Sequence, residues 1–192
     1  MENPWIHGAE ILNQGGIVIF PTDTAYGIGC RIDMQHSVDH LFIIRKRPQN
    51  QAMPVLVSGK AMAEKYYSRI TPEMNRLIRS YWPGALTIIA DCRRDRIYAP
   101  IRGGGSTVGL RMPDNAELLN MILHTRVPVL GPSANFHGLP TPFSEKDLDP
   151  QLVKLADWVI PGICRLRQVS TVVRISGGKT SLIRDGAVKI SI

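Results

Sequence analysis

Residues 17–30 read Ile-Val-Ile-Phe-Pro-Thr-Asp-Thr-Ala-Tyr-Gly-Ile-Gly-Cys. The first four residues are β-branched or aromatic, which predicts a buried strand. Pro21 is expected to end this strand, because it has no N–H to donate to a neighbouring strand. The short hydroxyl and carboxyl side chains of residues 22–24 follow at once, and two glycines further on would allow a close backbone approach to a ligand. The stretch therefore predicts a buried strand that leads into a ligand-binding loop.

Helices and strands are expected to alternate along the rest of the chain, without a linker or repeat. Apolar spacing predicts helices at residues 5–13, 37–46, 115–124 and 145–155, and one more that begins at Thr71-Pro72-Glu73 and ends before Trp82. Strands are predicted at residues 17–20, 26–31, 54–57, 85–90, 107–111, 127–130, 157–160, 171–175, 181–184 and 187–190. This order predicts the α/β class and one domain over residues 1–192, built on a twisted mixed β-sheet with flanking helices.

The composition is that of a folded globular protein with an anionic partner. Of 192 residues, 44% are hydrophobic and 20% are charged, and 23 Lys and Arg against 16 Asp and Glu give a net charge of +7. Such a balance favours nucleic acid, nucleotide or acidic lipid as a partner. Cys30, Cys92 and Cys164 are widely spaced and odd in number, so neither a disulfide framework nor a zinc site is expected. Without a signal peptide or a long apolar run, we expect a cytoplasmic protein that uses no membrane.

Several common motifs fail on their spacing. Gly178-Lys179-Thr180 resembles the end of a phosphate-binding P-loop, but Val173 stands where its first glycine is needed. His36 and His40 lie one helical turn apart, yet no third ligand accompanies them, so no protein-bound metal is predicted. No nucleophile with a partner base is evident, which argues against an amidohydrolase or acyltransferase.

Arginines at the ends of predicted elements are the candidate anion-binding groups. Arg111 ends an apolar strand, so its side chain is expected to reach a cleft, where its planar fork can bind a carboxylate or phosphate. A structural ion pair is the alternative for this residue. Lys46 lies between Arg45 and Arg47, and a solvated surface is an equally good interpretation for it.

Six motifs in the same order resemble the YrdC-like family, whose members make threonylcarbamoyl-AMP for tRNA modification. They are Pro21–Gly29, Arg45–Pro48, Trp82–Thr87, Ser106–Pro113, Gly131–Asn135 and Ser170–Val173, and the resemblance extends from about Ala9 to Val188. It implies a single YrdC-like domain with a basic concave cleft, too short for the second C-terminal domain of some members. It also implies an L-threonylcarbamoyladenylate synthase, a nucleotidyltransferase that uses L-threonine, bicarbonate or CO2, and ATP, and releases pyrophosphate.

The resemblance also assigns site residues by position. L-Threonine would be bound by Thr22, Tyr26, Arg111, Gly131 and Ser170. ATP would be bound by Arg45, Arg47, Gln51, Thr107, Ser133, Asn135, Thr141 and Arg184, with Arg45 and Arg47 as the catalytic groups. Arg45, Gln51 and Thr141 depart from the family's usual Lys, Asn and Ser. Mg²⁺ would be held mainly by phosphates and water, with Asp23 in contact through water.

Two further functions stay open at this point. One is a non-catalytic RNA-binding module of the same fold, which the basic composition also favours. The other is a related branch that has lost synthesis, although Ser133 and Asn135, which some such relatives lack, are present here. For an active enzyme, tRNA and the proteins that transfer the threonylcarbamoyl group are the expected partners.

Overall fold

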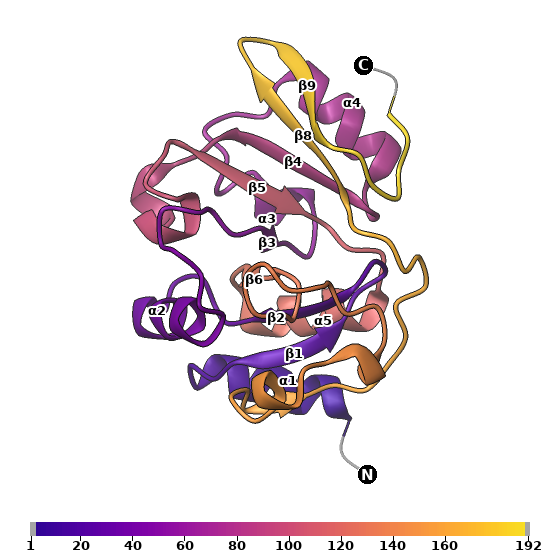
Figure 1. The fold of residues 1–192 in the computed structure, drawn as a ribbon. Helices are drawn as coiled ribbons and strands as arrows, with labels where there is room; N and C mark the ends of the chain where they lie inside the picture. Colours follow the sequence, from indigo (N-terminus) through magenta and orange to yellow (C-terminus); the bar gives the residue numbers. More distant parts are fainter. Residues whose placement is uncertain (1–2, 191–192) are drawn as a thin grey trace.

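The computed structural model describes residues 3–190 and confirms the α/β class (Figure 1). Its α-helices are α1 (Pro4–Asn13), α2 (Gln35–Ile44), α3 (Lys60–Ala63), α4 (Pro72–Tyr81), α5 (Ala116–Thr125) and α6 (Pro150–Val153). Short 3₁₀ helices are η1 (Arg94–Arg96), η2 (Ala99–Arg102) and η3 (Glu145–Asp147). The strands are β1 (Val18–Pro21), β2 (Tyr26–Gly29), β3 (Val55–Leu56), β4 (Leu86–Asp91), β5 (Thr107–Arg111), β6 (Val129–Leu130), β7 (Trp158–Val159), β8 (Thr171–Ser176) and β9 (Lys179–Arg184).

The strands form two mixed sheets, where the sequence predicted one. The smaller sheet has the order β2-β1-β7, in which β1 is antiparallel to β2 and parallel to β7. The larger sheet has the order β6-β3-β5-β4-β8-β9. In it, β4 is antiparallel to β5 and parallel to β8. In Figure 1 the smaller sheet lies with α1 and α5, and the β8–β9 hairpin lies beside α4 at the opposite end.

The segment after β6 joins the two sheets by running along β2. The Ile28 amide donates to the Pro132 carbonyl at 2.9 Å, and the Ala134 amide donates to the Tyr26 carbonyl at 2.8 Å. Gly29 makes this approach possible, because a Cβ there would lie 1.8 Å from the Leu130 carbonyl oxygen. The loops that follow β1 and β6 are therefore held on the same side of the molecule.

Both faces of β1 are buried, which explains its unbroken apolar sequence. Val18 and Phe20 belong to a core cluster with Leu12 of α1 and Leu118 of α5. Ile19 faces the other way, into the larger core cluster between the sheets and α2. The loop at residues 22–25 thus begins from a strand that is fixed on two sides.

The ends of the elements follow local chemistry in some places and tertiary contacts in others. Thr71 caps α4 as predicted, since its hydroxyl accepts from the Met74 amide at 3.2 Å. The predicted helix at 145–155 is wrong: it is divided into η3 and α6, and Pro150, which has no N–H, starts α6 after the cap residue Asp149.

The strand predicted at residues 187–190 is also absent. The backbone of Val188 pairs there with a side chain. The Thr171 hydroxyl donates to the Val188 carbonyl at 2.6 Å and accepts from its amide at 3.1 Å. Within residues 3–190 no helix has the length and apolar character that crossing a bilayer requires.

Candidate functional site

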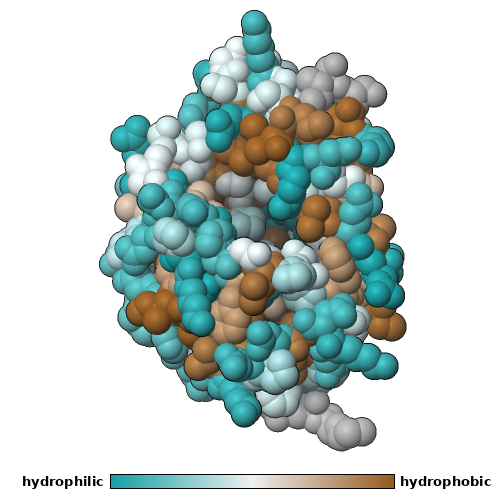
Figure 2. All heavy atoms as spheres, in the orientation of Figure 1, coloured by the Kyte–Doolittle hydropathy of each residue, from teal (hydrophilic) through white to brown (hydrophobic). Residues whose placement is uncertain are grey.

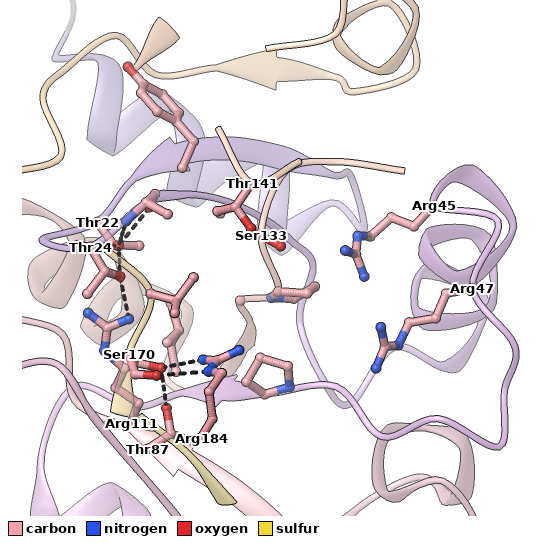
Figure 3. A pocket seen from close by; sticks show the side chains of 18 residues that line it. Thr22, Thr24, Arg45, Arg47, Thr87, Arg111, Ser133, Thr141, Ser170 and Arg184 are labelled. Atoms are coloured by element: carbon pink, nitrogen blue, oxygen red, sulfur yellow. Dashed lines mark hydrogen bonds between the residues drawn. The ribbon is translucent and has the colours of Figure 1, made fainter. Parts of the chain in front are cut away.

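A cavity of about 180 Å³ is lined by residues from both sheets. It opens at the hollow near the middle of the face in Figure 2, and Figure 3 shows its lining. Most of the predicted site residues line it: Thr22, Tyr26, Arg45, Arg47, Arg111, Gly131, Ser133, Thr141, Ser170 and Arg184. Figure 3 places Arg111 and the threonine loop at one end of the cavity and Arg45 and Arg47 at the other.

Arg111 is held at its end by three different acceptors. It is only 6% exposed and pairs with the buried carboxylate of Asp23 through Nη2. Nη1 donates to the Thr24 hydroxyl at 2.7 Å, and Nε donates to the Gly84 carbonyl at 3.0 Å. Burial lowers the pKa of Arg111, and the Asp23 carboxylate opposes that shift. A guanidinium has five N–H groups, so these three contacts leave one N–H on each terminal nitrogen without a partner among the described residues.

The hydroxyl groups of the threonine loop form a directed chain. Thr22 Oγ1 donates its one hydrogen to the Ala25 carbonyl at 2.7 Å. The contact of 2.9 Å between Thr22 Oγ1 and Thr24 Oγ1 is therefore donated by Thr24, which accepts in turn from Arg111. Thr22 Oγ1 also accepts from the Thr24 and Ala25 amides at 3.1 and 3.2 Å. A ligand contact with Thr22 would have to replace one of these bonds, so this hydroxyl mainly shapes the loop.

Arg45 lies at the other end with almost no partners. It caps the C-terminus of α2 and is 2% exposed. Its Nη2 donates to Asn135 Oδ1 at 3.3 Å, while Nε and Nη1 have no partner among the described residues. Burial, together with repulsion from Arg47, lowers the pKa of Arg45 to about 10. Such a buried cation is suited to bind an anion that enters the cavity.

Arg47 is half-buried and is fixed by neutral groups. Nε donates to the Gln51 carbonyl at 3.1 Å, and Nη2 donates to the Ala52 carbonyl at 2.8 Å. Nη1 lies 3.2 Å from His137 Nδ1, which must accept, because a guanidinium only donates. Burial lowers the pKa of Arg47. The two arginines at this end carry no ion pair with the described residues.

Asn135 lies behind the lining and supports it. Its Oδ1 accepts from the Ser133 hydroxyl at 2.5 Å and from Arg45. Its Nδ2 donates to the Leu139 carbonyl at 2.6 Å and to the Phe136 carbonyl at 3.0 Å. Asn135 therefore positions both Arg45 and Ser133. The sequence analysis expected Asn135 itself to contact ATP, but its side chain lies outside the lining.

Ser170, the residue before β8, contacts the predicted site residue Arg184 of β9 and also Thr87 of β4. The side chain of Arg184 donates to its carbonyl and hydroxyl oxygens, both at 3.0 Å. The hydroxyl groups of Ser170 and Thr87 lie 2.9 Å apart, as Figure 3 shows. Arg184 is exposed at the rim, between the two ends of the cavity.

The remaining predicted residues are Tyr26, Gly131, Thr107 and Gln51, and not all of them line the cavity. The Tyr26 hydroxyl donates to the Gly162 carbonyl at 2.8 Å, and burial raises its pKa to about 12, so the phenol stays neutral. Gly131 lines the cavity, and a Cβ there would lie 2.4 Å from Leu56 Cγ. Thr107 lines an adjoining groove of about 250 Å³ that shares Arg47, Thr87 and Arg184 with the cavity. The side chain of Gln51 is outside the lining, although its carbonyl holds Arg47.

Sequence reasoning missed several residues of the site. Thr24 and Thr87 both line the cavity and belong to motifs described above. Thr24 closely follows a predicted strand and Thr87 lies within one, so the position of each hydroxyl group could have indicated a site residue. His137 gave no such signal, because nothing in the local pattern indicates its contact with Arg47. Leu56 and Pro54 supply apolar lining from β3 and the residue before it, which periodicity alone cannot distinguish from core.

Carboxylates that could hold a metal do not line the cavity. Among residues 3–190 there is no group of three His, Cys, Asp or Glu side chains arranged for a metal ion. Asp23 is paired with Arg111 and lies outside the lining, so it does not fit the suggested contact with Mg²⁺. A divalent ion would have to depend on ligand phosphates and water at this site.

Comparison with known proteins identifies the family of the chain. The Sua5/YciO/YrdC family model, described as "Telomere recombination", matches residues 10–186. A threonylcarbamoyl-AMP synthase of Bacillus subtilis is 29% identical over 184 residues, covering 94% of this chain and 52% of that protein. A putative threonylcarbamoyl-AMP synthase of Methanocaldococcus jannaschii is 31% identical over 182 residues, covering 94% of this chain and 84% of that protein.

Solved structures give the same result. The structure of Pyrococcus abyssi Sua5 complexed with L-threonine has a TM-score of 0.90 at 28% identity, over 95% of this chain and 54% of that one. The chain thus spans about half the length of the Bacillus and Pyrococcus relatives. Escherichia coli YciO shares the fold, with a TM-score of 0.84 at 22% identity over 95% of this chain and 88% of that one. On the family match over residues 10–186 and the shared fold, the chain belongs to the Sua5/YciO/YrdC family.

Proposed function

We propose that the chain is an L-threonylcarbamoyladenylate synthase, a nucleotidyltransferase that joins L-threonine, CO2 or bicarbonate, and AMP from ATP. One observation carries this proposal. The cavity has an arginine with two free donors at one end and a buried, unpaired arginine beside a second one at the other. The names of the synthase relatives and the threonine complex of Pyrococcus abyssi Sua5 support the same function.

The Arg111 end suits an amino acid. The two free N–H groups of Arg111 can bind both oxygens of a carboxylate, in the geometry that lysine cannot reproduce. Ser170 and Thr87 lie nearby and can contact a small hydroxylated side chain. L-Threonine, with a carboxylate and one hydroxyl group, fits these donors and acceptors.

The Arg45 end suits a polyphosphate. Arg45 and Arg47 have no carboxylate partner among the described residues, so a negatively charged ligand supplies the charge that the protein does not. Ser133 and Thr141 line the cavity between the two ends and can contact the nucleotide. The adjoining groove with Thr107 and Arg184 extends the site and gives the rest of ATP a place.

The reaction needs orientation and charge stabilisation more than a protein nucleophile. The threonine amine attacks the carbon of CO2 and loses a proton, which gives a carbamate. A carbamate oxygen then attacks the α-phosphorus of ATP, and the bond to pyrophosphate breaks. Arginine donors at the phosphates stabilise the charge that is redistributed in this step. Mg²⁺, bound by phosphate oxygens and water, would neutralise the polyphosphate further.

The cavity offers no activated nucleophile that would favour a covalent mechanism. Cys164 is buried beside the Asp23–Arg111 pair, and burial raises the pKa of its thiol to about 11. The hydroxyl of Ser133 donates to Asn135, and that of Ser170 is paired with Thr87, so neither contacts a base.

Pyrophosphate release is the direct test. We expect the protein with ATP and Mg²⁺ to release pyrophosphate only when L-threonine and bicarbonate are both present, without any RNA. Serine, or threonine without bicarbonate, serves as the substrate control. Release that is independent of threonine, or absent with all substrates, would contradict the proposal.

An RNA-binding module is the function that the net charge of +7 also favours. The variant Ser133→Ala with Asn135→Ala separates the two, because these residues support Arg45 inside the cavity and present no extended basic surface. We expect it to lose the ATP-dependent reaction and to keep any weak, salt-sensitive retention of tRNA. If the variant loses RNA retention while the wild type releases no pyrophosphate, the RNA-binding function is correct.

A further inference from the structure

The four arginines of the cavity differ in charge compensation. Arg45, Arg47 and Arg184 have hydrogen bonds only to neutral groups among the described residues. Arg111 alone has a carboxylate, that of Asp23. The Arg45 end is therefore strongly cationic, whereas the charge of Arg111 is cancelled.

Asp23 is fixed in place and cannot easily turn toward solvent. It is 2% exposed, and its backbone carbonyl accepts from the Leu166 amide at 2.8 Å. One carboxylate oxygen contacts Arg111, and the other, Oδ2, has no partner among the described residues. In a buried setting the charge of this carboxylate is weakly screened, so it acts on a ligand at Arg111 without touching it.

We propose that Asp23 determines which charge type of ligand the Arg111 end accepts. On the basis of the proposed function, Asp23 is a positioning and specificity residue. It favours a zwitterionic amino acid over a carboxylate ligand that carries only a negative charge. The guanidinium attracts the carboxylate, and Asp23 attracts the ammonium and repels surplus negative charge. Without Asp23, Arg111 and the nearby Arg184 would make this end another general anion site.

The neighbouring groups leave this role to Asp23. Cys164 is the other acidic group beside the pair, and its raised pKa keeps the thiol neutral. The threonine hydroxyls are neutral and are engaged in the loop. Within the described residues no carboxylate lines the cavity, and Asp23 is the only one paired with a cavity arginine, so one substitution removes the negative charge beside Arg111.

Two ligands of nearly equal shape test the inference. L-Threonine is net neutral, and 3-hydroxybutyrate is the same carboxylate and hydroxyl framework without the amine. Calorimetry measures both dissociation constants on the wild type, on Asp23→Asn and on a matched control, Asp33→Asn. Asp33 also pairs with an arginine, Arg31 at 2.8 Å, but it is exposed and outside the cavity.

We expect the wild type to prefer threonine by roughly tenfold or more, since an uncompensated buried charge is strongly disfavoured. In Asp23→Asn the affinity for threonine should fall, while the affinity for 3-hydroxybutyrate stays equal or rises. The preference for threonine over 3-hydroxybutyrate should therefore be lost. Asp33→Asn should keep the wild-type ratio. A purely structural role of Asp23 would weaken both ligands in parallel, and that result overturns the inference.

The outcomes also separate this inference from the proposed function. If the wild type binds threonine and the ratio is the same in Asp23→Asn, only the specificity role is wrong. If the wild type binds neither ligand, both are wrong. Should Asp23→Asn not fold, Asp23→Asn with Arg111→Gln removes both charges together. We expect this double variant to show no preference between the ligands, and a retained tenfold preference would overturn the inference.

Discussion

Arg111 and Arg45 are both buried and line the same cavity, yet their surroundings are opposite. Arg111 has a carboxylate, a hydroxyl and a carbonyl as acceptors. Arg45 has one amide oxygen, at 3.3 Å. The charge of Arg111 is thus compensated in the free protein, whereas that of Arg45 lacks a counterion and lowers the stability of the fold. The protein itself therefore compensates the charge at one end of the cavity and leaves the charge at the other end without a counterion.

The local structure around the two residues explains how each is held. Arg111 ends β5 in the larger sheet, where it is paired with Leu56 of β3. Arg45 follows the last turn of α2, where the partial negative charge of the helix terminus favours a cation. Lys46 then takes a left-handed backbone, with φ 51°, and its ammonium lies 4.7 Å from the ring centre of Phe136. This turn separates Lys46 from Arg45 and Arg47, which both face the cavity.

The largest expected effect is that of Arg111→Ala on stability. Removing the guanidinium leaves Asp23 buried and unpaired, which should lower the free energy of unfolding by about 3–5 kcal/mol. Threonine binding should weaken by roughly tenfold or more, because a charge-assisted contact of about 1.5–3 kcal/mol is lost. Urea denaturation and calorimetry measure the two effects, and Arg111→Lys should rescue threonine binding only in part. Wild-type threonine affinity in Arg111→Ala would contradict the assignment.

Arg45→Met should have the opposite effect on stability. It replaces an uncompensated buried charge with an apolar side chain of similar length. Burial lowers the pKa of Arg45 to about 10, which corresponds to a gain on the order of 3 kcal/mol in the free energy of unfolding when the charge is removed. Turnover should fall by about 10²–10³, with threonine affinity retained, since a donor to the reacting phosphates is lost. Destabilisation as large as that of Arg111→Ala would show that Arg45 is a structural residue.

The stability difference between the wild type and Arg45→Met should depend on pH. Arg45 binds its proton more weakly in the folded state than in the unfolded state. Its buried charge therefore destabilises the fold fully at pH values well below 10. As the pH rises above about 10, folded Arg45 loses its proton first and the penalty declines. The stability advantage of Arg45→Met over the wild type should therefore narrow between pH 9 and pH 11, on the order of one unit either side of that pKa. A constant difference over that range would contradict the assigned cause.

Arg47→Ala should have a smaller and more selective effect. Arg47 is half-buried and is held by two carbonyls and His137, so its loss leaves no buried charge behind. We expect turnover at saturating ATP to fall by roughly 10- to 100-fold, as for one arginine–phosphate contact of about 1.5–3 kcal/mol. Threonine affinity should be unchanged. An unchanged turnover would show that this end of α2 is only a solvated basic surface.

Lys46→Ala is the matched control with the smallest effect. Lys46 is exposed, lies outside the cavity lining and has its ammonium over the ring of Phe136. Loss of this exposed cation–π contact should change stability by about 0.5–1 kcal/mol, and kcat/KM for ATP by less than about threefold. A reduction as large as that of Arg47→Ala would mean that charge density at the helix end, and not direct contact, controls the reaction.

The sequence alone was sufficient where a local pattern has one structural solution. The apolar run at residues 17–20 predicted β1, and Thr71-Pro72-Glu73 predicted the start of α4. Most of the residues that line the cavity lie within the six motifs. Short patterns of this kind depend on backbone hydrogen bonding and burial within one element, so they can be read without the rest of the chain.

The sequence was insufficient where the backbone had two possible partners. The apolar spacing of residues 145–155 favoured one helix, but Pro150 removed a donor and divided it. Residues 187–190 have the composition of a strand, but the Thr171 side chain pairs with Val188. The division of the strands into two sheets likewise depends on the path of the segment after β6 along β2.

Residue types and motif order were enough to predict arginines and hydroxyl groups that could bind an anionic ligand. Which arginine is paired with a carboxylate is visible only in the folded protein. Asp23 and Arg111 are 88 residues apart in sequence, and Arg45 and Asn135 are 90 apart. Charge compensation and desolvation depend on the distance between side chains in the folded protein, and no local pattern contains that distance.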